Sequence, residues 1–370
     1  MFRNKITTWY PGAVLLTVIV LVAMGGSVTL ADFTFGAPTN LGPAMNSPGM
    51  ESGPSLSADG KQLYFTRWTD TTGEIWACQR ATVDSAWEPA SRLGPPLATD
   101  ADECPFLTSD GLSLYFDSWR DGGTGGCDLW MTTSAIPDGS WGAPVNLGPA
   151  VNSASDDWCP SISADGLELY FSSNRPGGSG TWDIWTASRA TVNDTWGSPV
   201  NLGASINTEA EDCWPSLSPD GLVLFFTSNR SGGQGSWDLY MARRTTRKDP
   251  WGSPTNFGPL VNSPEGQGGP KVSFDGLTLC FYSLRSDGAG LGDIWQTPIL
   301  PIVDFNADKK VDLVDLVMLI DDWGKNKSPC DIGPMPWGDG KVDIEDLKVF
   351  MTFYEKENPP AQPWKTFPTW

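Results

Sequence analysis

The chain has 370 residues, a formal net charge of −20 at pH 7 and no histidine. This charge argues against nucleic acid as a partner, because phosphate neutralisation requires clustered lysines and arginines. The lack of histidine excludes the Ser-His-Asp triad, the Cys-His pair and every zinc site that uses an imidazole ligand.

The first 31 residues are predicted to form an export signal. Arg3 and Lys5 precede an apolar run, residues 13–24, and small residues follow it as far as Ala31. A charged, an apolar and a small-residue region in this order are typical of a cleaved signal. The apolar run is shorter than the roughly 20 residues that cross a bilayer. We therefore expect a secreted or periplasmic protein that meets the membrane through this signal, and attachment to a cell surface would need a partner.

Residues 32–300 repeat one sequence unit five times. The Asp-Gly turn of the unit recurs at Gly60, Gly111, Gly166, Gly221 and Gly276, in steps of 51, 55, 55 and 55 residues. A triplet of acidic, aliphatic and aromatic residues begins at Glu74, Asp128, Asp183, Asp238 and Asp293. Two markers that keep one period over five copies indicate a propeller or a related repeat array.

Each unit predicts four short strands and no helix. In the fourth unit "WPSLS" and "LVLFFTS" flank the turn "PDG", whose glycine accommodates a positive φ, and "WDLYMARR" follows as a third strand. Segments such as "WGSPVNLG" provide the fourth strand. Four strands in five units predict an all-β five-bladed β-propeller. Residues 33–43 resemble the fourth strand alone, and the last unit lacks one, so the N-terminal strand is expected to close the last blade.

The motifs "SPDG" and "DLY" make residues 33–300 resemble the TolB-type, WD-like β-propeller repeat family. The resemblance implies the propeller fold. It does not single out one function, because the family includes binding platforms, periplasmic scaffolds and accessory domains of enzymes. The seven cysteines include no CxxC pair, and we expect most of them to be buried as small apolar residues.

A comparison of the five units separates scaffold from candidate site. Residues that every unit repeats, such as the aspartate of the Asp-Gly turn, are expected to serve the architecture. The connection into each innermost strand carries Glu51, Asp102, Asp157, Asp212 or Gln267, which are predicted to ring one mouth of the central channel. Trp158 and Trp214 stand nearby in two neighbouring units only. Such carboxylates and aromatic rings could bind a cation or a sugar; the alternative is that they cap strand ends and keep the surface soluble.

Residues 301–356 contain a calcium-loop motif. Positions 1, 3, 5, 9 and 12 of the loop are Asp304, Asn306, Asp308, Asp312 and Asp315, and the main-chain carbonyl of Lys310 would be the seventh-position ligand. An apolar pattern with helical spacing follows over residues 313–323. Lys309 stands where glycine is usual, at a backbone position that costs other residues about 1 kcal/mol.

A second, altered copy of this motif follows. Its later ligand positions are matched by Asp339, Lys341, Asp343 and Asp346, and a second helical pattern covers residues 344–354. Met335 and Trp337 stand at the first two ligand positions, where Asp331 could substitute by way of a longer loop. Two calcium loops, each with a helix, resemble a type I dockerin. The resemblance implies one bound Ca²⁺, leaves a second open, and implies attachment to a cohesin-type partner. The tail, residues 357–370, is rich in proline and expected to be disordered.

Two functions fit these observations. The favoured hypothesis is an exported, non-catalytic binding or scaffold protein, whose propeller recognises a glycan or a protein and whose dockerin-like module attaches it to a partner engaged in polysaccharide degradation. The regular repeats and the lack of an isolated acid/base pair favour it. The alternative is a glycoside hydrolase, which needs two carboxylates about 5 to 10 Å apart and no histidine. Asp157 and Asp212 are the catalytic candidates under that alternative.

Overall fold

The computed structural model describes residues 33–68, 72–97, 101–137, 139–326, 328–333, 338 and 340–358. The export signal expected in residues 1–31 lies outside them, as does the tail from residue 359 onward. None of the helices in the described part of the chain is long and apolar enough to cross a membrane.

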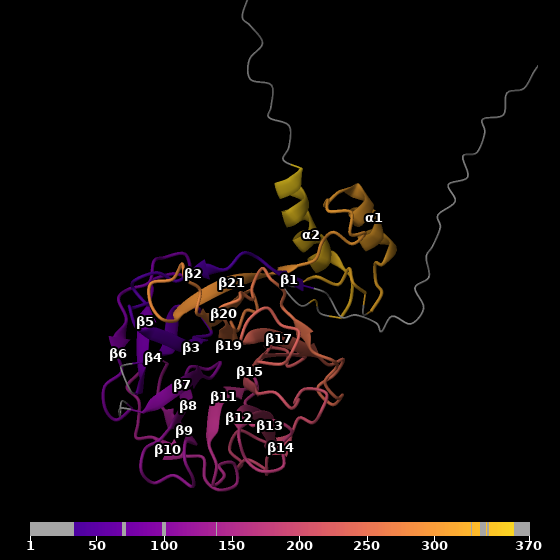
Figure 1. Cartoon of the computed structure of the whole chain (residues 1–370). Helices are drawn as coiled ribbons and strands as arrows, with labels where there is room; N and C mark the ends of the chain where they lie inside the picture. The colour runs from indigo at the N-terminus through magenta and orange to yellow at the C-terminus, as the bar shows by residue number, and fades with distance from the viewer. Residues whose placement is uncertain are drawn as a thin grey trace, which may run out of the picture.

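Five antiparallel sheets surround a central axis as the blades of a propeller (Figure 1). Blade 1 consists of β3 (Met50–Leu56), β4 (Gln62–Trp68), β5 (Gly73–Gln79) and β6 (Ser91–Arg92). Blade 2 consists of β7 (Asp102–Leu107), β8 (Ser113–Ser118), β9 (Asp128–Thr133) and β10 (Val145–Asn146). Blade 3 consists of β11 (Asp157–Ile162), β12 (Glu168–Ser173), β13 (Asp183–Ser188) and β14 (Val200–Asn201). Blade 4 consists of β15 (Asp212–Leu217), β16 (Val223–Ser228), β17 (Asp238–Arg243) and β18 (Thr255–Asn256). Blade 5 consists of β19 (Gln267–Val272), β20 (Thr278–Ser283) and β21 (Asp293–Pro301), with β1 (Phe33–Phe35) and β2 (Thr39–Asn40) added. The predicted five-bladed propeller is confirmed.

The last blade joins the two ends of the ring. β2 pairs with β21, with Asn40 opposite Trp295, just as Asn146 lies opposite Trp130 in blade 2. β1 pairs with the far end of β21, beginning at Phe33. The N-terminal segment therefore supplies the fourth strand that the last repeat lacks, as the sequence predicts. It also adds a fifth strand, which the repeat pattern did not predict.

The repeated Asp-Gly turn is a structural device. In blade 3 the Ser163 hydroxyl donates to Asp165 at 2.6 Å, and the Leu167 N–H donates to the same carboxylate at 3.1 Å. Gly166 has φ = 74°, which glycine adopts without steric cost. The same hydroxyl bond is made from Ser57, Thr108, Ser218 and Ser273 in the other blades. A bond that recurs in all five blades serves the turn and not a single ligand.

The acidic residue that opens each third strand is a second such device. In blade 3 Asp183 accepts hydrogen bonds from the Ser179 N–H at 2.6 Å and from the Asn201 amide at 2.8 Å. The carboxylate thereby ties the glycine-rich loop to the fourth strand. Asp128, Asp238 and Asp293 do the same in their blades. The residues that the sequence unit repeats therefore serve mostly to hold each blade together.

The hydrophobic core consists of clusters between neighbouring blades. Between blades 2 and 3, for example, Leu129, Leu169 and Phe171 are fully buried, because successive residues of a strand face opposite sides and the apolar ones face the next blade. Fully burying one such side chain stabilises the fold by about 1.5–3 kcal/mol. Cys78 and Cys280 belong to the cluster between blades 5 and 1, as expected for small apolar residues.

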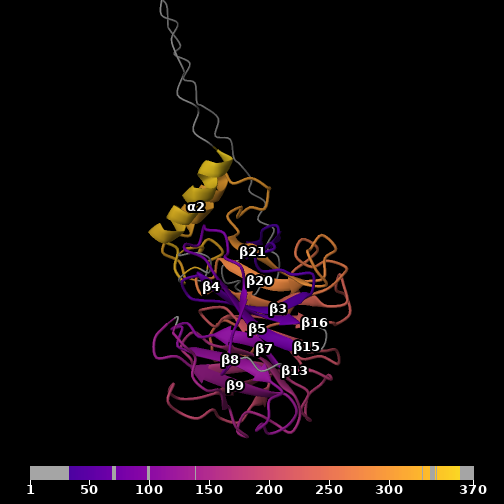
Figure 2. The same ribbon diagram turned by 90° about the vertical axis from the view of Figure 1, so that its left-hand side faces the viewer.

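The C-terminal segment packs around its own small core. Its helices are α1 (Leu313–Asp321) and α2 (Ile344–Glu357), and Figure 2 shows them outside the ring, on the side where β21 ends. Asp312 and Asp343 cap the two helices with complete capping boxes. The core consists of Val303, Val311, Leu319, Cys330, Ile332, Val342 and Phe350. Relative to the sequence pattern, α1 ends two residues earlier and α2 three residues later.

Candidate functional site

The four carboxylates predicted to ring the channel mouth are buried in ion pairs. Glu51, Asp102, Asp157 and Asp212 have no exposed surface. Their partners are arginines of the same blade, Arg67 at 2.7 Å, Arg120 at 2.6 Å, Arg175 at 2.5 Å, and Arg230. In blade 5 the neutral Gln267 takes this position and accepts from the Ser263 N–H at 2.6 Å. These residues therefore brace their blades, by ion pairs in blades 1 to 4 and by hydrogen bonds of Gln267 in blade 5.

Blade 3 shows how completely such a brace uses its carboxylate. Asp157 accepts from Arg175 through Oδ1 and from the Ser153 N–H, at 2.6 Å, through Oδ2. Arg175 also donates to the Val151 carbonyl at 2.7 Å. A ligand would have to break these bonds to reach the carboxylate, and the same holds for Asp212. The catalytic candidates of the glycoside hydrolase alternative are thus engaged in the scaffold.

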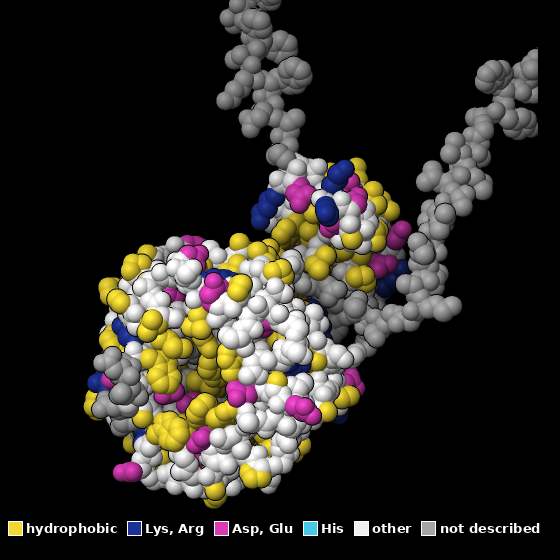
Figure 3. Space-filling view, in the orientation of Figure 1, with side chains coloured by type: hydrophobic (Ala, Val, Ile, Leu, Met, Phe, Trp, Pro, Cys, Tyr) yellow, Lys and Arg dark blue, Asp and Glu magenta, His cyan; other side chains and the backbone are white. Residues whose placement is uncertain are grey.

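A cavity of about 490 Å³ opens at the centre of the ring. Figure 3 shows hydrophobic side chains gathered in a hollow there. Its lining includes Trp68, Trp119, Trp158 and Trp214, and two acids, Glu103 and Asp117. Trp158 and Trp214, which the sequence singled out, therefore line this pocket.

Glu103 and Asp117 form an acid pair that belongs to blade 2 alone. They lie directly opposite each other on β7 and β8, and residues so placed have Cβ atoms about 4.5–5.5 Å apart. The positions equivalent to Glu103 are Ser52, Trp158, Cys213 and Gly268, and those equivalent to Asp117 are Thr66, Ser172, Thr227 and Tyr282. Departure from the repeat is the sequence signal that indicates this pair, and it lies one residue after Asp102, whose position is acidic in four of the five units.

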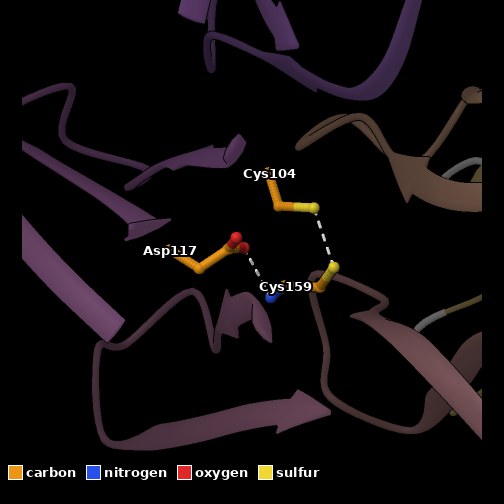
Figure 4. A group of neighbouring side chains, drawn as sticks. All are labelled: Cys104, Asp117 and Cys159. Atoms are coloured by element: carbon orange, nitrogen blue, oxygen red, sulfur yellow. Dashed lines mark hydrogen bonds between the residues drawn. The ribbon is translucent and has the colours of Figure 1, made fainter. Parts of the chain in front are cut away.

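The fold holds Asp117 through a bond that other blades make with a hydroxyl. The Cys104 N–H donates to Thr66 at 2.9 Å and the Trp214 N–H to Ser172 at 2.8 Å. Between blades 2 and 3 the Cys159 N–H donates to the Asp117 carboxylate at 2.9 Å instead (Figure 4). The innermost strands bulge at this point, and such bulges redirect side chains. A carboxylate thus replaces a hydroxyl in one place around the channel.

Burial sets the proton affinities of the two acids apart. It raises the pKa of Glu103 to about 8, and the neighbouring charge of Asp117 adds to that rise. Burial raises the pKa of Asp117 as well, to about 6. The bond from the Cys159 N–H stabilises the ionised form and so offsets part of that rise. Gly73 leaves room for the Glu103 side chain, since a Cβ at that position would lie 2.5 Å from the Glu103 Cγ. At neutral pH one carboxyl therefore holds its proton while the other is ionised.

The floor of the pocket brings two thiols beside Asp117. The Sγ atoms of Cys104 and Cys159 lie 2.7 Å apart, and all three side chains point toward one another (Figure 4). Burial raises the pKa of the Cys159 thiol well above its usual value. Lys271 donates to the carbonyls of Pro160 and Pro215 at 3.1 and 3.2 Å, and its charge acts on the same thiols. That buried ammonium disfavours a metal cation among these three donors.

The first loop that is predicted to bind calcium is folded around its carboxylates. Asp304 accepts the N–H groups of Asp308 at 3.1 Å and of Lys309 at 2.7 Å. Asp315 is fully buried and accepts the Phe305 N–H at 2.8 Å. Lys309 has φ = 70°, the backbone conformation for which glycine is usual. The loop therefore adopts the required turn despite the lysine.

The second loop repeats these bonds from a different starting residue. The Gly340 N–H donates to Asp331 at 2.8 Å, as Lys309 does to Asp304. The Ile332 N–H donates to Asp346 at 2.5 Å, as the residue after Asp304 does in the first loop. Asp331 thus takes the place of Asp304, with four additional residues before the turn.

The other predicted ligands are placed as follows. Asn306 Oδ1 accepts the Asp308 N–H at 2.9 Å, and Lys310 lies two residues after Asp308 in the first loop. Lys341 forms an isolated β-bridge with Asn326, and Asp343 caps α2. Asp339, and the residues Met335 and Trp337, lie outside the described residues. The ligand atoms that the described residues of these two loops are expected to offer are all oxygens, which suit Ca²⁺.

No family model and no curated protein matches the sequence. Solved structures with a similar fold include a protein assigned as TolB from Agrobacterium tumefaciens, with 18% identity, coverage of 70% of this chain and 80% of that chain, and a TM-score of 0.44. A thermostable family-43 glycoside hydrolase shows 13% identity, coverage of 69% and 91%, and a TM-score of 0.48. An α-L-arabinofuranosidase from Lactobacillus brevis shows 16% identity, coverage of 70% and 91%, and a TM-score of 0.46. Because these TM-scores lie below 0.5, activity has to be argued from the pocket.

The favoured expectation of a non-catalytic binding or scaffold protein is wrong. It relied on the lack of an isolated acid/base pair, and the pocket contains one in Glu103 and Asp117. The glycoside hydrolase alternative fits this acid pair better, although its acids are not Asp157 and Asp212.

Proposed function

We propose that the protein is a glycoside hydrolase that cleaves O-glycosyl bonds of a polysaccharide in the central pocket. The observation that supports this is the pair Glu103 and Asp117, two carboxyl groups with separated pKa values in a cavity lined by tryptophans. Their positions on facing strands are compatible with the separation of about 5 to 10 Å that this chemistry uses. Indole faces favour the apolar faces of sugar rings.

In the proposed mechanism Glu103 is the general acid. Its proton passes to the glycosidic oxygen as the bond from that oxygen to the anomeric carbon breaks. Asp117 is the ionised carboxylate that acts on the anomeric carbon, directly or through a water molecule. Direct attack would form a glycosyl ester with Asp117, which water, deprotonated by Glu103, then hydrolyses, so that two inversions retain the anomeric configuration. Attack by water on the sugar inverts it in a single step, and NMR of the first product distinguishes the two.

Neutral replacements of the two acids test this function. Glu103→Gln and Asp117→Asn should each lower kcat by at least about 100-fold, because each removes a proton-transfer or charge-stabilising group. Asp121→Asn is a matched control, since Asp121 is exposed in the same blade. The measurement is reducing-sugar release from a panel of plant and algal polysaccharides. Full activity in folded Glu103→Gln protein, or no release by the natural chain from any member of the panel, would contradict the proposal.

We also propose that residues 301–356 bind Ca²⁺ through both loops. The paired N–H bonds to Asp304 and Asp331 support it, because they give the two loops the same frame. Calorimetric titration of the full chain with CaCl₂ should show two sites, and Asp331→Asn should remove one of them. A single site that is unchanged in Asp331→Asn would show that only the first loop binds.

We further propose that this module docks onto a cohesin-like partner outside the cytoplasm. Its exposed apolar residues are Leu313, Val314, Val317, Ile320, Trp323 and Ile344. A group of exposed apolar side chains on one small module is typical of an interaction surface. Binding to a purified type I cohesin domain should require Ca²⁺ and should weaken in Val317→Asp. Binding that persists in EGTA would contradict the calcium-dependent attachment.

A further inference from the structure

We infer that the pocket continues into an aromatic trough that binds additional sugar units, so that the substrate is an extended, β-linked glycan chain. The trough consists of Trp158, Trp182, Trp214, Trp237 and Tyr282. The inference rests on the proposed function for the place where the glycan is cleaved. How the glycan is held is argued from the trough alone.

The trough is a second cavity that shares walls with the first. It has a volume of about 230 Å³ and is lined by the five aromatic residues together with Glu211 and Cys213. Trp158 and Trp214 also line the central pocket that contains the acid pair. A ligand that extends from the acids past these two indoles therefore enters the trough directly.

The trough breaks the five-fold regularity, as a single binding site must. Trp182 and Trp237 stand immediately before the third strands of blades 3 and 4. The equivalent residues of blades 1, 2 and 5 are Gly73, Cys127 and Gly292. The acids come from blade 2 and the added tryptophans from the next two blades. The site thus has a direction around the ring, from the reacting centre toward blade 4.

The aromatic rings are fixed by one another. Trp158 and Trp182 are stacked with centroids 4.1 Å apart and an angle of 23° between their planes. Trp214 meets Tyr282 edge to face, with centroids 4.8 Å apart. Rigid, half-buried indoles lose little conformational entropy when a ligand arrives. They are therefore suited to stacking against a flat ligand.

The chemistry of the lining favours a neutral carbohydrate. The charged residue of the trough is Glu211, which accepts from the Thr181 hydroxyl at 3.0 Å and can accept from sugar hydroxyls. An acidic edge repels nucleic acid and offers no counter-charge to an anionic glycan. Equatorially linked glucose or xylose units present flat apolar faces to indole rings and hydroxyl groups at their edges. The flat faces of such units could stack on the indole rings of the trough, and their hydroxyl groups could donate to Glu211.

Binding measured without turnover tests the trough. In a Glu103→Gln background, calorimetry would compare cellobiose and cellohexaose, or the xylose equivalents. The double variant Trp182→Ala/Trp237→Ala should lower hexamer affinity by at least about tenfold and leave dimer affinity unchanged. Trp182→Phe/Trp237→Phe should restore much of the hexamer affinity, because a stacking face remains. Trp323→Ala, in the C-terminal module, is the control for the loss of a tryptophan.

The outcomes separate the two claims. Hexamer binding that the double alanine variant leaves unchanged overturns the trough, even where turnover by the natural chain supports the proposed function. Hexamer binding that depends on both tryptophans supports the trough, even where the natural chain releases no sugar and the proposed function fails. Equal losses for dimer and hexamer, or failure of the folded phenylalanine variant to recover affinity, also overturn it.

Discussion

At the scale of single residues, two carboxyl groups of one pocket differ because their surroundings differ. Glu103 has lost much of its water and faces another acid, so its proton is held more tightly. Asp117 is buried as well, but it accepts the Cys159 N–H in its ionised form. The same strand pair thus supplies a proton donor and an anion at one pH.

The pH dependence of activity should reflect this pair. The proposed mechanism requires Asp117 ionised and Glu103 protonated, so kcat/KM should rise as pH passes about 6 and fall as pH passes about 8. Initial rates between pH 4 and 10 provide the measurement. A rate that stays constant from pH 5 to pH 9 would mean that neither carboxyl takes part in the limiting step.

The raised pKa of Glu103 should also make the stability of the fold depend on pH. The variant Glu103→Gln, which cannot ionise, should lack this dependence. Between about pH 4.5 and pH 8 folded Glu103 keeps a proton that the unfolded chain has lost, so the free energy of unfolding falls as pH rises. In Glu103→Gln the free energy of unfolding no longer falls with pH on account of this residue. The variant should be more stable than the natural chain by about 1–3 kcal/mol at pH 8 and equally stable near pH 4. Urea unfolding at both pH values measures the difference, and a variant that is less stable at pH 8 would contradict it.

At the scale of elements, each innermost strand begins with a brace and then bulges. The repeat predicted the strands and the turn aspartates, because these follow alternation and turn chemistry that a sequence displays directly. Alternation and turn chemistry could not locate the acid pair, which only its departure from the repeat indicates. The bond that Asp117 accepts from the Cys159 N–H of the next blade cannot be read from the sequence. Asp331 stays a predicted substitute ligand, reached by way of a longer loop. Its position was decided by backbone bonds that spacing alone does not show.

The braces should be needed for stability and not for ligand binding. Asp157→Ala leaves Arg175 buried without its partner and should cost about 3 kcal/mol in the free energy of unfolding. Asp157→Gln copies the natural arrangement of Gln267 in blade 5 and should cost less. Chemical denaturation measures both variants. Loss of glycan affinity with unchanged stability in Asp157→Ala would instead restore the ring to a binding role.

At the scale of the whole molecule, near-identical blades carry one asymmetric site. The braces and turns are repeated, whereas the acid pair is confined to blade 2 and the added tryptophans of the trough to blades 3 and 4. Lys271 is buried among the innermost strands, where its ammonium donates to the carbonyls of Pro160 and Pro215 and lies 5.0 Å from the centroid of the Phe106 ring.

Deleting residues 33–41 should open the propeller. Blade 5 would lose β1 and β2, and the edge of β21 would be left unpaired, which favours association between chains. We expect soluble aggregates by size-exclusion chromatography and a melting temperature lower by more than about 5 °C. A chain truncated after residue 301 retains the seam and serves as the control. A monomer with an unchanged melting temperature would show that the seam is dispensable.

The position of the seam also decides when the native state becomes accessible during biosynthesis. Asn40 bonds to Asp293, 253 positions later in the chain. The ribosome therefore releases one half of the closing contact first and the other half only when the ring is almost complete. Until then β1 and β2 have no partner strand, and the ring cannot close. The closed propeller is therefore reached only near the end of synthesis.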